Sequence, residues 1–547
     1  MATMQATDSI QRPKVHRLAA VRRFYVYLVA FVSQIFVLVG VIDLIDLIGR
    51  MWLQSGGILQ GTFVRSATAR SIGMLAVATP LFLVHWWLGQ RFREDPPERA
   101  SVLRKLFLYG STAVSLGLLL ANLYPIIRDL TWLIAGVPVR SVELWPSGWL
   151  TWGSTAGIGA GLLGYWHRVL MADGDQGREQ RGARFVRQLF LLAAGLFGLG
   201  LAVWGARTLI QLGLQVAVDR WSGALDQDWW HLPFGGAFSQ LLVGGWLWRV
   251  NWQQWRQMID VDRHEGQAAL RRIYLYLSVF SGAALALTPA ALLLREALLM
   301  ALGSGGGTLA ELLERMVEPT SFIPIGVLVW GGHWALLRRE TDAYGDSGQS
   351  AMVRRLYAYL VAAIGLALLW TGAVQVIHAL LGSWLTGDLW DDPLATGLSL
   401  LAIGAPVWTI FWRRVQSIAE AAEGTQERDS WPRKVYLYGV ALVGALVLLS
   451  TLAQALYRVL LTLLGEPDLA FSSNELAYQL ADSAIAAVLW SIHLWALRAD
   501  GRFEKPPQVV EAPDPHAALQ VRIALLEQEL NSARAELTAL EQRRASS

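Results

Sequence analysis

The sequence has 547 residues, none of them cysteine, and only 16% of them are charged. Without cysteine, the chain has no disulfide bond, thiolate metal site or cysteine nucleophile. Soluble domains carry roughly 25% charged residues, whereas this chain is 54% hydrophobic and contains 26 tryptophans. Tryptophan collects at membrane–water interfaces. The composition therefore predicts a membrane protein, and the net charge of +3 gives no reason to expect a nucleic-acid partner.

Catalytic motifs are missing as well. The sequence contains no phosphate-binding glycine loop with its lysine, no HExxH pair and no GxSxG elbow. The glycine-rich stretch 303–308 lacks the lysine that a phosphate site needs, so we interpret it as a flexible connector. We therefore predict no catalytic residue, no metal site and no cofactor.

What the sequence does contain is one six-residue signature in six copies, 79 to 84 residues apart. The copies are RRFYVY at 22–27, RKLFLY at 104–109, RQLFLL at 187–192, RRIYLY at 271–276, RRLYAY at 354–359 and RKVYLY at 433–438. A fixed period of this length defines a structural unit. Each copy opens a hydrophobic stretch, so the unit that we predict is a membrane hairpin.

Each repeat offers two apolar runs that are long enough for a helix to cross a bilayer about 30 Å thick. The first runs are 24–42, 106–127, 188–206, 273–294, 356–377 and 435–457, and the second runs are 71–90, 144–167, 229–248, 319–337, 393–412 and 476–497. Unpaired backbone groups cannot face lipid, so these runs must be helices. The sequence predicts an all-α membrane protein with twelve transmembrane helices arranged as six tandem parallel two-helix hairpins.

The predicted organisation follows from these runs. It comprises an N-terminal segment 1–21, hairpins at 22–103, 104–186, 187–270 (degenerate), 271–353, 354–432 and 433–498, a proline-rich linker 499–515 and a tail 516–547. Basic residues gather at both ends of each hairpin, while the loops inside hairpins collect acids. The positive-inside rule then places the signatures and both termini in the cytoplasm.

The signature itself is typical of an interfacial anchor. Arginine can reach lipid phosphates from a helix end, and tyrosine places its ring among acyl chains with its hydroxyl among headgroups. The predicted anchors are Arg22, Arg23, Tyr25, Tyr27, Arg104, Tyr109, Arg271, Arg272, Tyr274, Tyr276, Arg354, Arg355, Tyr357, Tyr359, Arg433, Tyr436 and Tyr438.

Histidines near the ends of second helices leave another interpretation open. His85, His167, His333 and His493 would lie at one depth in the membrane, where paired histidines can bind haem or a chlorophyll-type pigment. Two of the six repeats have no such histidine, and no haem motif is present.

The tail 516–547 carries a heptad pattern. Its apolar positions, spaced alternately by four and three residues, are Leu519, Ile523, Leu526, Leu530, Ala533, Leu537 and Leu540. This spacing predicts a cytoplasmic coiled coil. We expect the tail to join copies of the chain or to bind a coiled-coil protein partner, because its polar face is too acidic for a membrane-surface helix.

The repeated opening, followed by a small-residue helix and a second helix that ends in aromatic and basic residues, resembles a bacterial multi-pass membrane repeat of unknown function. The resemblance covers nearly all of 22–498. It implies a protein of the bacterial inner membrane and supplies no activity, cofactor or catalytic residue. The third copy departs most, with Gln188, Phe190 and Leu192 in place of the second base and both tyrosines.

Three functional hypotheses follow. The first is a structural or assembly protein that oligomerises, or recruits a partner, through its tail. The second is a channel, transporter or lipid-handling protein, with a cavity lined by polar residues such as Asp43, Asp46 and Arg128. The third is a haem- or pigment-binding protein. The spans hold almost no ionisable residue at mid-depth, which argues against a proton relay or an ion-coupled carrier.

Overall fold

The computed structural model is helical wherever the chain is described. The described residues are 2–53, 61–137, 147–174, 181–223, 229–386, 390–421, 424–465, 473–503 and 515–545. Within these ranges no residue lies in a β-strand. Residues 504–514, which make up most of the predicted proline-rich linker 499–515, lie outside the described residues.

The body consists of long helices. They are α1 (Ala2–Leu53), α2 (Gly61–Arg91), α4 (Val102–Ile134), α5 (Ser147–Ala172), α6 (Arg181–Ser222), α7 (His231–Val261), α8 (Ala269–Ala301), α9 (Leu309–Tyr344), α10 (Gly348–Thr386), α11 (Asp391–Glu420), α13 (Trp431–Leu463) and α15 (Ser473–Phe503). Short elements are η1 (Phe92–Glu94), α3 (Pro96–Arg99), η3 (Arg263–Gln267) and α12 (Thr425–Arg428), and the tail forms α16 (Pro515–Ala545). Helix α1 starts at Ala2, well before the predicted first hairpin at 22–103.

Among the described residues, ten helices are long and apolar enough to cross a membrane. Two of the twelve predicted spans, α5 and α7, are not among them. Their composition explains this, because α5 is rich in glycine and α7 carries several glutamines and tryptophans along its second half. In its described residues the chain is thus all-helical, with ten candidate membrane spans.

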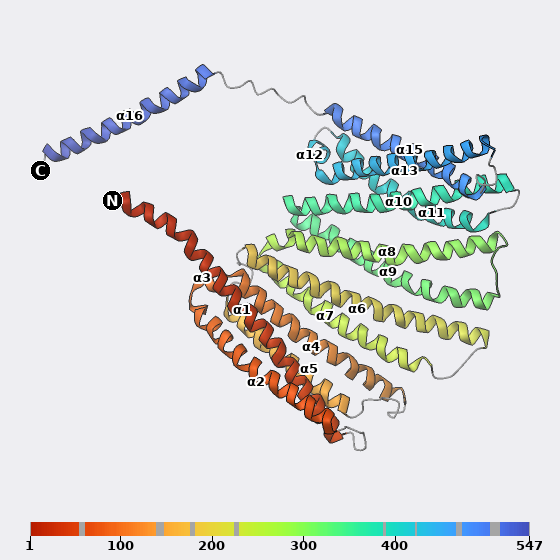
Figure 1. Cartoon of the computed structure of the whole chain (residues 1–547), viewed down its shortest axis with the longest axis horizontal. Helices are drawn as coiled ribbons and strands as arrows, with labels where there is room; N and C mark the ends of the chain where they lie inside the picture. Colours follow the sequence, from red (N-terminus) through yellow and green to blue (C-terminus); the bar gives the residue numbers. More distant parts are fainter. Residues whose placement is uncertain are drawn as a thin grey trace.

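The long helices pack in the order of the chain. Each first helix contacts the second helix of its own pair and both helices of the next pair, as α1 does with α2, α4 and α5. Figure 1 shows the result as an open fan, with α1 and α2 at one end and α13 and α15 at the other. Helix α16 lies apart from this fan. The signatures lie at or near the start of α4, α6, α8, α10 and α13 and inside α1, and together they mark one edge of the fan, which we call the signature end.

Close helix contact depends on glycine inside the pairs. A Cβ added to Gly282 of α8 would lie 2.4 Å from the backbone nitrogen of Trp330, and one added to Gly326 of α9 would lie 2.5 Å from that of Ala286. No side chain fits at such distances. Small residues therefore set the spacing of α8 and α9.

Among the described residues, turns that contain a short helical element alternate along the chain with turns that do not. A short helical element with a buried glutamate follows α2, α7 and α11, and these glutamates are Glu98, Glu265 and Glu427. The structure describes no such element after α5 or α9. The fan thus divides into three units of two pairs each, namely a first unit (α1–α5), a middle unit (α6–α9) and a last unit (α10–α15).

Candidate functional site

Each unit contains a buried group of charged residues at the signature end, which we call its ionic cluster. The cluster joins the two pairs of the unit. It forms because each signature lies in a first helix, while acidic residues lie where second helices end or just beyond them. Antiparallel packing of the two helices brings the signature and the acidic residues to the same level. We describe the clusters in the order first, last and middle, because the middle one differs.

In the first cluster, Glu98 is only 2% exposed and accepts hydrogen bonds from Arg23 Nε at 2.8 Å and from the Tyr27 hydroxyl at 3.1 Å. The guanidinium of Arg104, which is fully buried, binds both carboxylate oxygens of Asp173 at 2.7 and 3.0 Å. Nη1 of Arg104 also donates to the Tyr27 hydroxyl at 3.1 Å. Tyr27 therefore bridges the two ion pairs by donating to one and accepting from the other.

The last cluster repeats this arrangement. Glu427 accepts from Arg355 Nε at 2.9 Å and from the Tyr359 hydroxyl at 2.8 Å. Arg433 binds both oxygens of Asp500 at 2.7 and 2.9 Å, and its Nη1 lies 3.4 Å from the Tyr359 hydroxyl. The bidentate geometry is the strongest form of an arginine–carboxylate pair.

The middle cluster keeps the ion pairs with different residues. Glu265 accepts from Gln188 Nε2 and from Arg187 Nη2, both at 2.7 Å. Arg271 binds Glu340 at 2.6 Å through Nη2 and at 3.3 Å through Nε. Arg187 is the first residue of its signature, whereas the arginines that contact the glutamates most closely in the other clusters are second residues.

The bridging tyrosine is missing from the middle cluster. Leu192 lies four residues after Gln188, at the position that Tyr27 and Tyr359 hold after the corresponding arginines. As a consequence, Nη1 of Arg271 is buried without a hydrogen-bond partner. Its guanidinium instead lies 4.3 Å from the ring centre of Trp252. An unpaired buried donor costs about 1–3 kcal/mol. Of the three cluster arginines that bind the second carboxylate, Arg271 is therefore the one whose hydrogen-bonding capacity is least used.

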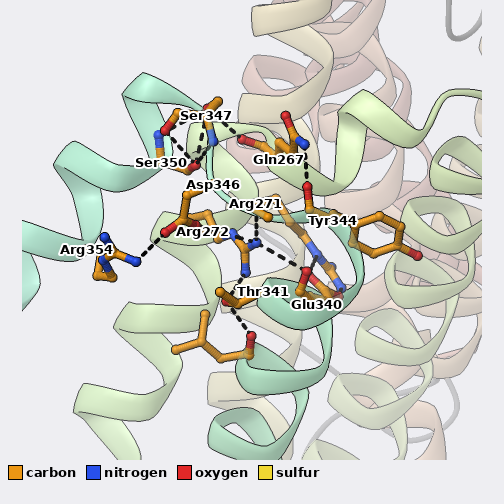
Figure 2. Close-up of polar contacts among 12 residues, drawn as sticks. Gln267, Arg271, Arg272, Glu340, Thr341, Tyr344, Asp346, Ser347, Ser350 and Arg354 are labelled. Carbon is orange, nitrogen blue, oxygen red and sulfur yellow. Dashed lines mark hydrogen bonds and ion pairs between the residues drawn. The ribbon is translucent and has the colours of Figure 1, made fainter.

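Figure 2 shows how the middle cluster reaches the last unit. Arg272, next to Arg271, donates to the Thr341 hydroxyl at 2.9 Å and lies 3.8 Å from Asp346. Asp346 in turn accepts from Arg354 of α10 at 2.7 Å. A continuous polar chain therefore runs from α8 across the end of α9 to α10.

Next to two of the clusters lies a hydrogen-bonded aromatic triad. In the middle unit the Trp248 indole donates to the Tyr274 hydroxyl at 2.8 Å, and that hydroxyl lies 3.3 Å from Nε2 of His333. Nδ1 of His333 lies 2.9 Å from the Val329 carbonyl oxygen. A carbonyl only accepts, so Nδ1 carries the proton and Nε2 accepts from the tyrosine.

The last unit has the same triad in Trp408, Tyr436 and His493. In the first unit the tyrosine and histidine positions are held by Phe107 and Trp166, which pack edge to face at 5.5 Å. Each of these residues has the same spacing from its cluster arginine or cluster carboxylate as its counterpart. The hydrogen-bonded Trp–Tyr–His triad is therefore present in the middle and last units, and ring packing between Phe107 and Trp166 takes its place in the first unit.

The burial of the signature corrects the anchor prediction. Ten of the predicted anchors are buried, namely Tyr27, Arg104, Tyr109, Arg271, Arg272, Tyr274, Tyr276, Tyr359, Arg433 and Tyr436. For these the expected contact with headgroups is wrong, because side chains enclosed by protein do not reach lipid. The remaining seven, Arg22, Arg23, Tyr25, Arg354, Arg355, Tyr357 and Tyr438, are exposed or half-buried. Their anchoring role stays a prediction.

The four histidines do not form one equivalent set. His333 and His493 are buried in triads with partners at both ring nitrogens, and His85 is buried with Nδ1 at 2.8 Å from the Leu81 carbonyl oxygen. His167 is exposed, and Trp166 holds the position equivalent to His333. Binding haem would require the two triads to break. Among the described residues, no group of three or more His, Cys, Asp or Glu side chains is arranged to hold a metal ion.

Sequence reasoning missed the acidic half of every cluster. Asp173, Glu340 and Asp500 lie 69, 69 and 67 residues after their arginine partners. Glu98, Glu265 and Glu427 lie 75, 78 and 72 residues after theirs. The carboxylate at the end of one repeat and the glutamate in the turn after the previous repeat alternate along the chain. Aligning the sequence in blocks of two repeats would have revealed this pattern. With every carboxylate paired to a cation, the clusters serve to lock helix pairs together.

The comparisons with known proteins agree with a three-unit chain. One family model, described as a domain of unknown function (DUF5671), matches residues 23–158, 188–326 and 355–488, so that one match falls in each unit. Together the matches cover more than half of the chain. No curated protein and no solved structure matches it.

Proposed function

This chain belongs to the family of the domain of unknown function DUF5671, and we propose that it is a membrane assembly protein. In this proposal the fan of helix pairs is a rigid membrane body, and α16 joins two copies of the chain on the cytoplasmic side. The observation that carries the proposal is the unpaired apolar stripe of α16. No catalytic activity is part of it.

The proposal includes twelve membrane spans in six hairpins. Helix α5 has 26 residues and α7 has 31, and a span needs about 20. Each packs along a candidate span on both sides, α5 against α1 and α4 and α7 against α4 and α6. Two helices enclosed in this way cross the same depth as their neighbours, and their glycines and amides then face protein as well as lipid.

We further propose that the signature end and both termini face the cytoplasm of a bacterium. The basic residues at that end and the positive-inside rule support this orientation. The absence of cysteine allows a direct test. In sealed inside-out vesicles, a membrane-impermeant maleimide should label Ser101→Cys and leave Gly306→Cys unlabelled, and intact spheroplasts should give the reverse. The opposite pattern would overturn the orientation.

The stripe on α16 is exposed along its length. Leu519, Ile523, Leu526, Leu530 and Leu537 are each between 51% and 59% exposed, and Ala533 is exposed too. The side chain of Leu540 lies outside the described residues. A single helix of this kind is marginal in water, and its exposed leucines gain free energy when a second helix covers them.

A second copy of the same chain fits this stripe. Both copies would leave the membrane at the same level, which makes a parallel pair. In a parallel coiled coil, flanking residues face a residue five positions later on the other helix. Arg522 would then face Glu527, and Glu529 would face Arg534, which are opposite charges. Tethering to one membrane raises the effective concentration of the two helices.

The test measures the mass of the full-length protein in detergent by light scattering. We expect a dimer that becomes a monomer in the seam variant Leu526→Asp/Leu530→Asp. Leu525 lies outside the seam and is equally exposed, so Leu525→Asp is the matched control and should remain a dimer. A monomeric wild-type protein, or a dimer that survives deletion of 515–547, would overturn the proposal.

A further inference from the structure

A cavity of about 660 Å³ lies between the first and middle units, among α4, α5, α6 and α7. Its walls are mostly apolar and include Leu116, Leu163, Leu247 and Val250. Polar groups line it as well, among them His167, Gln254 and Gln257. The ionic clusters and the α16 stripe do not account for this space.

The equivalent junction between the middle and last units is filled by aromatic rings. Trp334 lies six residues before Glu340, as His167 lies six before Asp173. Phe411 lies three residues after Trp408, as Asn251 lies three after Trp248. Trp334 packs against the buried cluster that contains Tyr276. The ring of Tyr357 lies 4.6 Å from that of Tyr276 and 5.9 Å from that of Phe411. Two aromatic side chains are thus replaced by smaller polar ones where the cavity occurs.

The cavity has the length of one leaflet. Along α4 it extends from Tyr109 to Leu119, which is about 15 Å at the rise of an α-helix. The hydrocarbon core of a bilayer is about 30 Å thick, so this is the depth of a single acyl chain. The mouth on α7 and α5 is open to the surroundings, since Gln257 and His167 are both exposed.

Its polar groups gather at the signature end. Helix α7 runs towards that end, and Gln254 and Gln257 occupy successive turns of its last part. Amide and imidazole N–H groups donate hydrogen bonds. The only arginine in the wall, Arg187, is already paired with Glu265. The site therefore offers hydrogen-bond donors and no uncompensated positive charge.

From this geometry we propose that the cavity binds one membrane phospholipid from the leaflet at the signature end. One acyl chain lies against Leu163, Leu247 and Val250, and the ester carbonyl and phosphate oxygens accept hydrogen bonds from Gln254, Gln257 and His167. The site would be specific to the junction of the first and middle units. It goes beyond the proposed assembly through α16 and does not depend on it, but it rests on the proposed membrane position of α5 and α7.

The experiment uses full-length protein in lipid nanodiscs that contain a phosphatidylethanolamine with a diazirine in one acyl chain. After illumination, mass spectrometry locates the cross-linked residues. We expect cross-links on Leu163, Leu247 and Val250. The filling variant His167→Trp/Asn251→Phe, which copies the aromatic junction, should lose them at least tenfold while labelling of the exposed Leu83 on α2 stays unchanged.

Two further variants make the result decisive. Gln254→Leu/Gln257→Leu keeps the cavity but removes donors, so the same cross-links should fall about tenfold, the value of roughly one net hydrogen bond. Leu83→Trp adds the same tryptophan ring as the filling variant, but on the lipid-facing side of α2. The cross-links in the cavity should remain unchanged in this variant. Absence of cross-links in the wild-type cavity, or their persistence in the folded filling variant, would overturn the proposal.

Discussion

The outer two ionic clusters and the middle one neutralise the buried glutamate of their unit with different residues. Glu98 and Glu427 are neutralised by the second arginine of their signatures, and the first arginines, Arg22 and Arg354, remain 44% and 48% exposed. In the middle unit that second residue is Gln188, which carries no charge. Arg187 is fully buried instead and binds the glutamate.

The difference shows which property the clusters conserve. A buried carboxylate without a cation is far more costly than a buried donor without an acceptor. The middle unit accordingly keeps its charges balanced and loses the bridging hydroxyl, leaving Nη1 of Arg271 unpaired. Charge balance is therefore the stricter requirement in these clusters.

The largest effect should come from removing a cluster carboxylate. Asp173→Ala leaves the fully buried Arg104 without its counter-ion, and breaking such a buried pair costs about 3–5 kcal/mol. We expect the free energy of unfolding in detergent to fall by the same amount. Tryptophan fluorescence monitors the unfolding. Asp429→Ala, at an exposed acid, is the control, and a loss below about 1 kcal/mol at Asp173 would contradict a structural role for the cluster.

The second prediction separates the middle unit from the outer ones. Arg187→Gln should destabilise the protein by about 3 kcal/mol, because the buried Glu265 then keeps only Arg184, which is 33% exposed and 3.5 Å away. The same change at Arg22 or Arg354 should cost no more than about 1 kcal/mol, since those side chains form surface contacts. Equal effects at all three positions, measured by the same unfolding assay, would remove the distinction between the units.

The third prediction concerns the bridge in the outer units. Tyr27→Phe removes a hydroxyl that joins Glu98 to Arg104, and Tyr359→Phe does the same in the last unit. Each should lower the free energy of unfolding by about 1–3 kcal/mol. The exposed Tyr438 offers the control change Tyr438→Phe, which should be neutral. A neutral Tyr27→Phe would show that the bridge contributes nothing.

The smallest effect is a gain. Leu192→Tyr supplies the missing hydroxyl next to Arg271, and one net hydrogen bond contributes about 1 kcal/mol. We expect a slightly higher melting temperature than in the wild type. In the background Arg271→Lys, where the guanidinium is gone, the gain should disappear. A gain that persists there would point to packing rather than to the hydrogen bond.

Much of the architecture was predictable from the sequence because it follows from local patterns. The six signatures and their period revealed tandem pairs, and the apolar runs revealed most of the helices. The helix α16 followed from the spacing of Leu519 to Leu540. The limits of this reasoning appear at α5 and α7, where glycine, glutamine and tryptophan blur the apolar signal.

The role of the signature was not predictable in the same way. Arg104 and Tyr27 match the composition of an interfacial anchor, yet both are buried. Whether an arginine at a helix start meets lipid or a carboxylate depends on residues about 70 positions away. His167 is not equivalent to His333 and His493, because it lies one residue later relative to the cluster carboxylate. A shift of one residue turns a side chain by about 100° around its helix.

The sequence alone thus determined a helical chain of repeated units with many candidate membrane spans and a helical tail, because hydropathy and period are properties of neighbouring residues. Only the tertiary structure decided that Arg104, Arg271 and Arg433 turn inward to carboxylates, that the pairs group into three units, and that one junction is hollow. These features depend on the register between antiparallel helices, which no local pattern records.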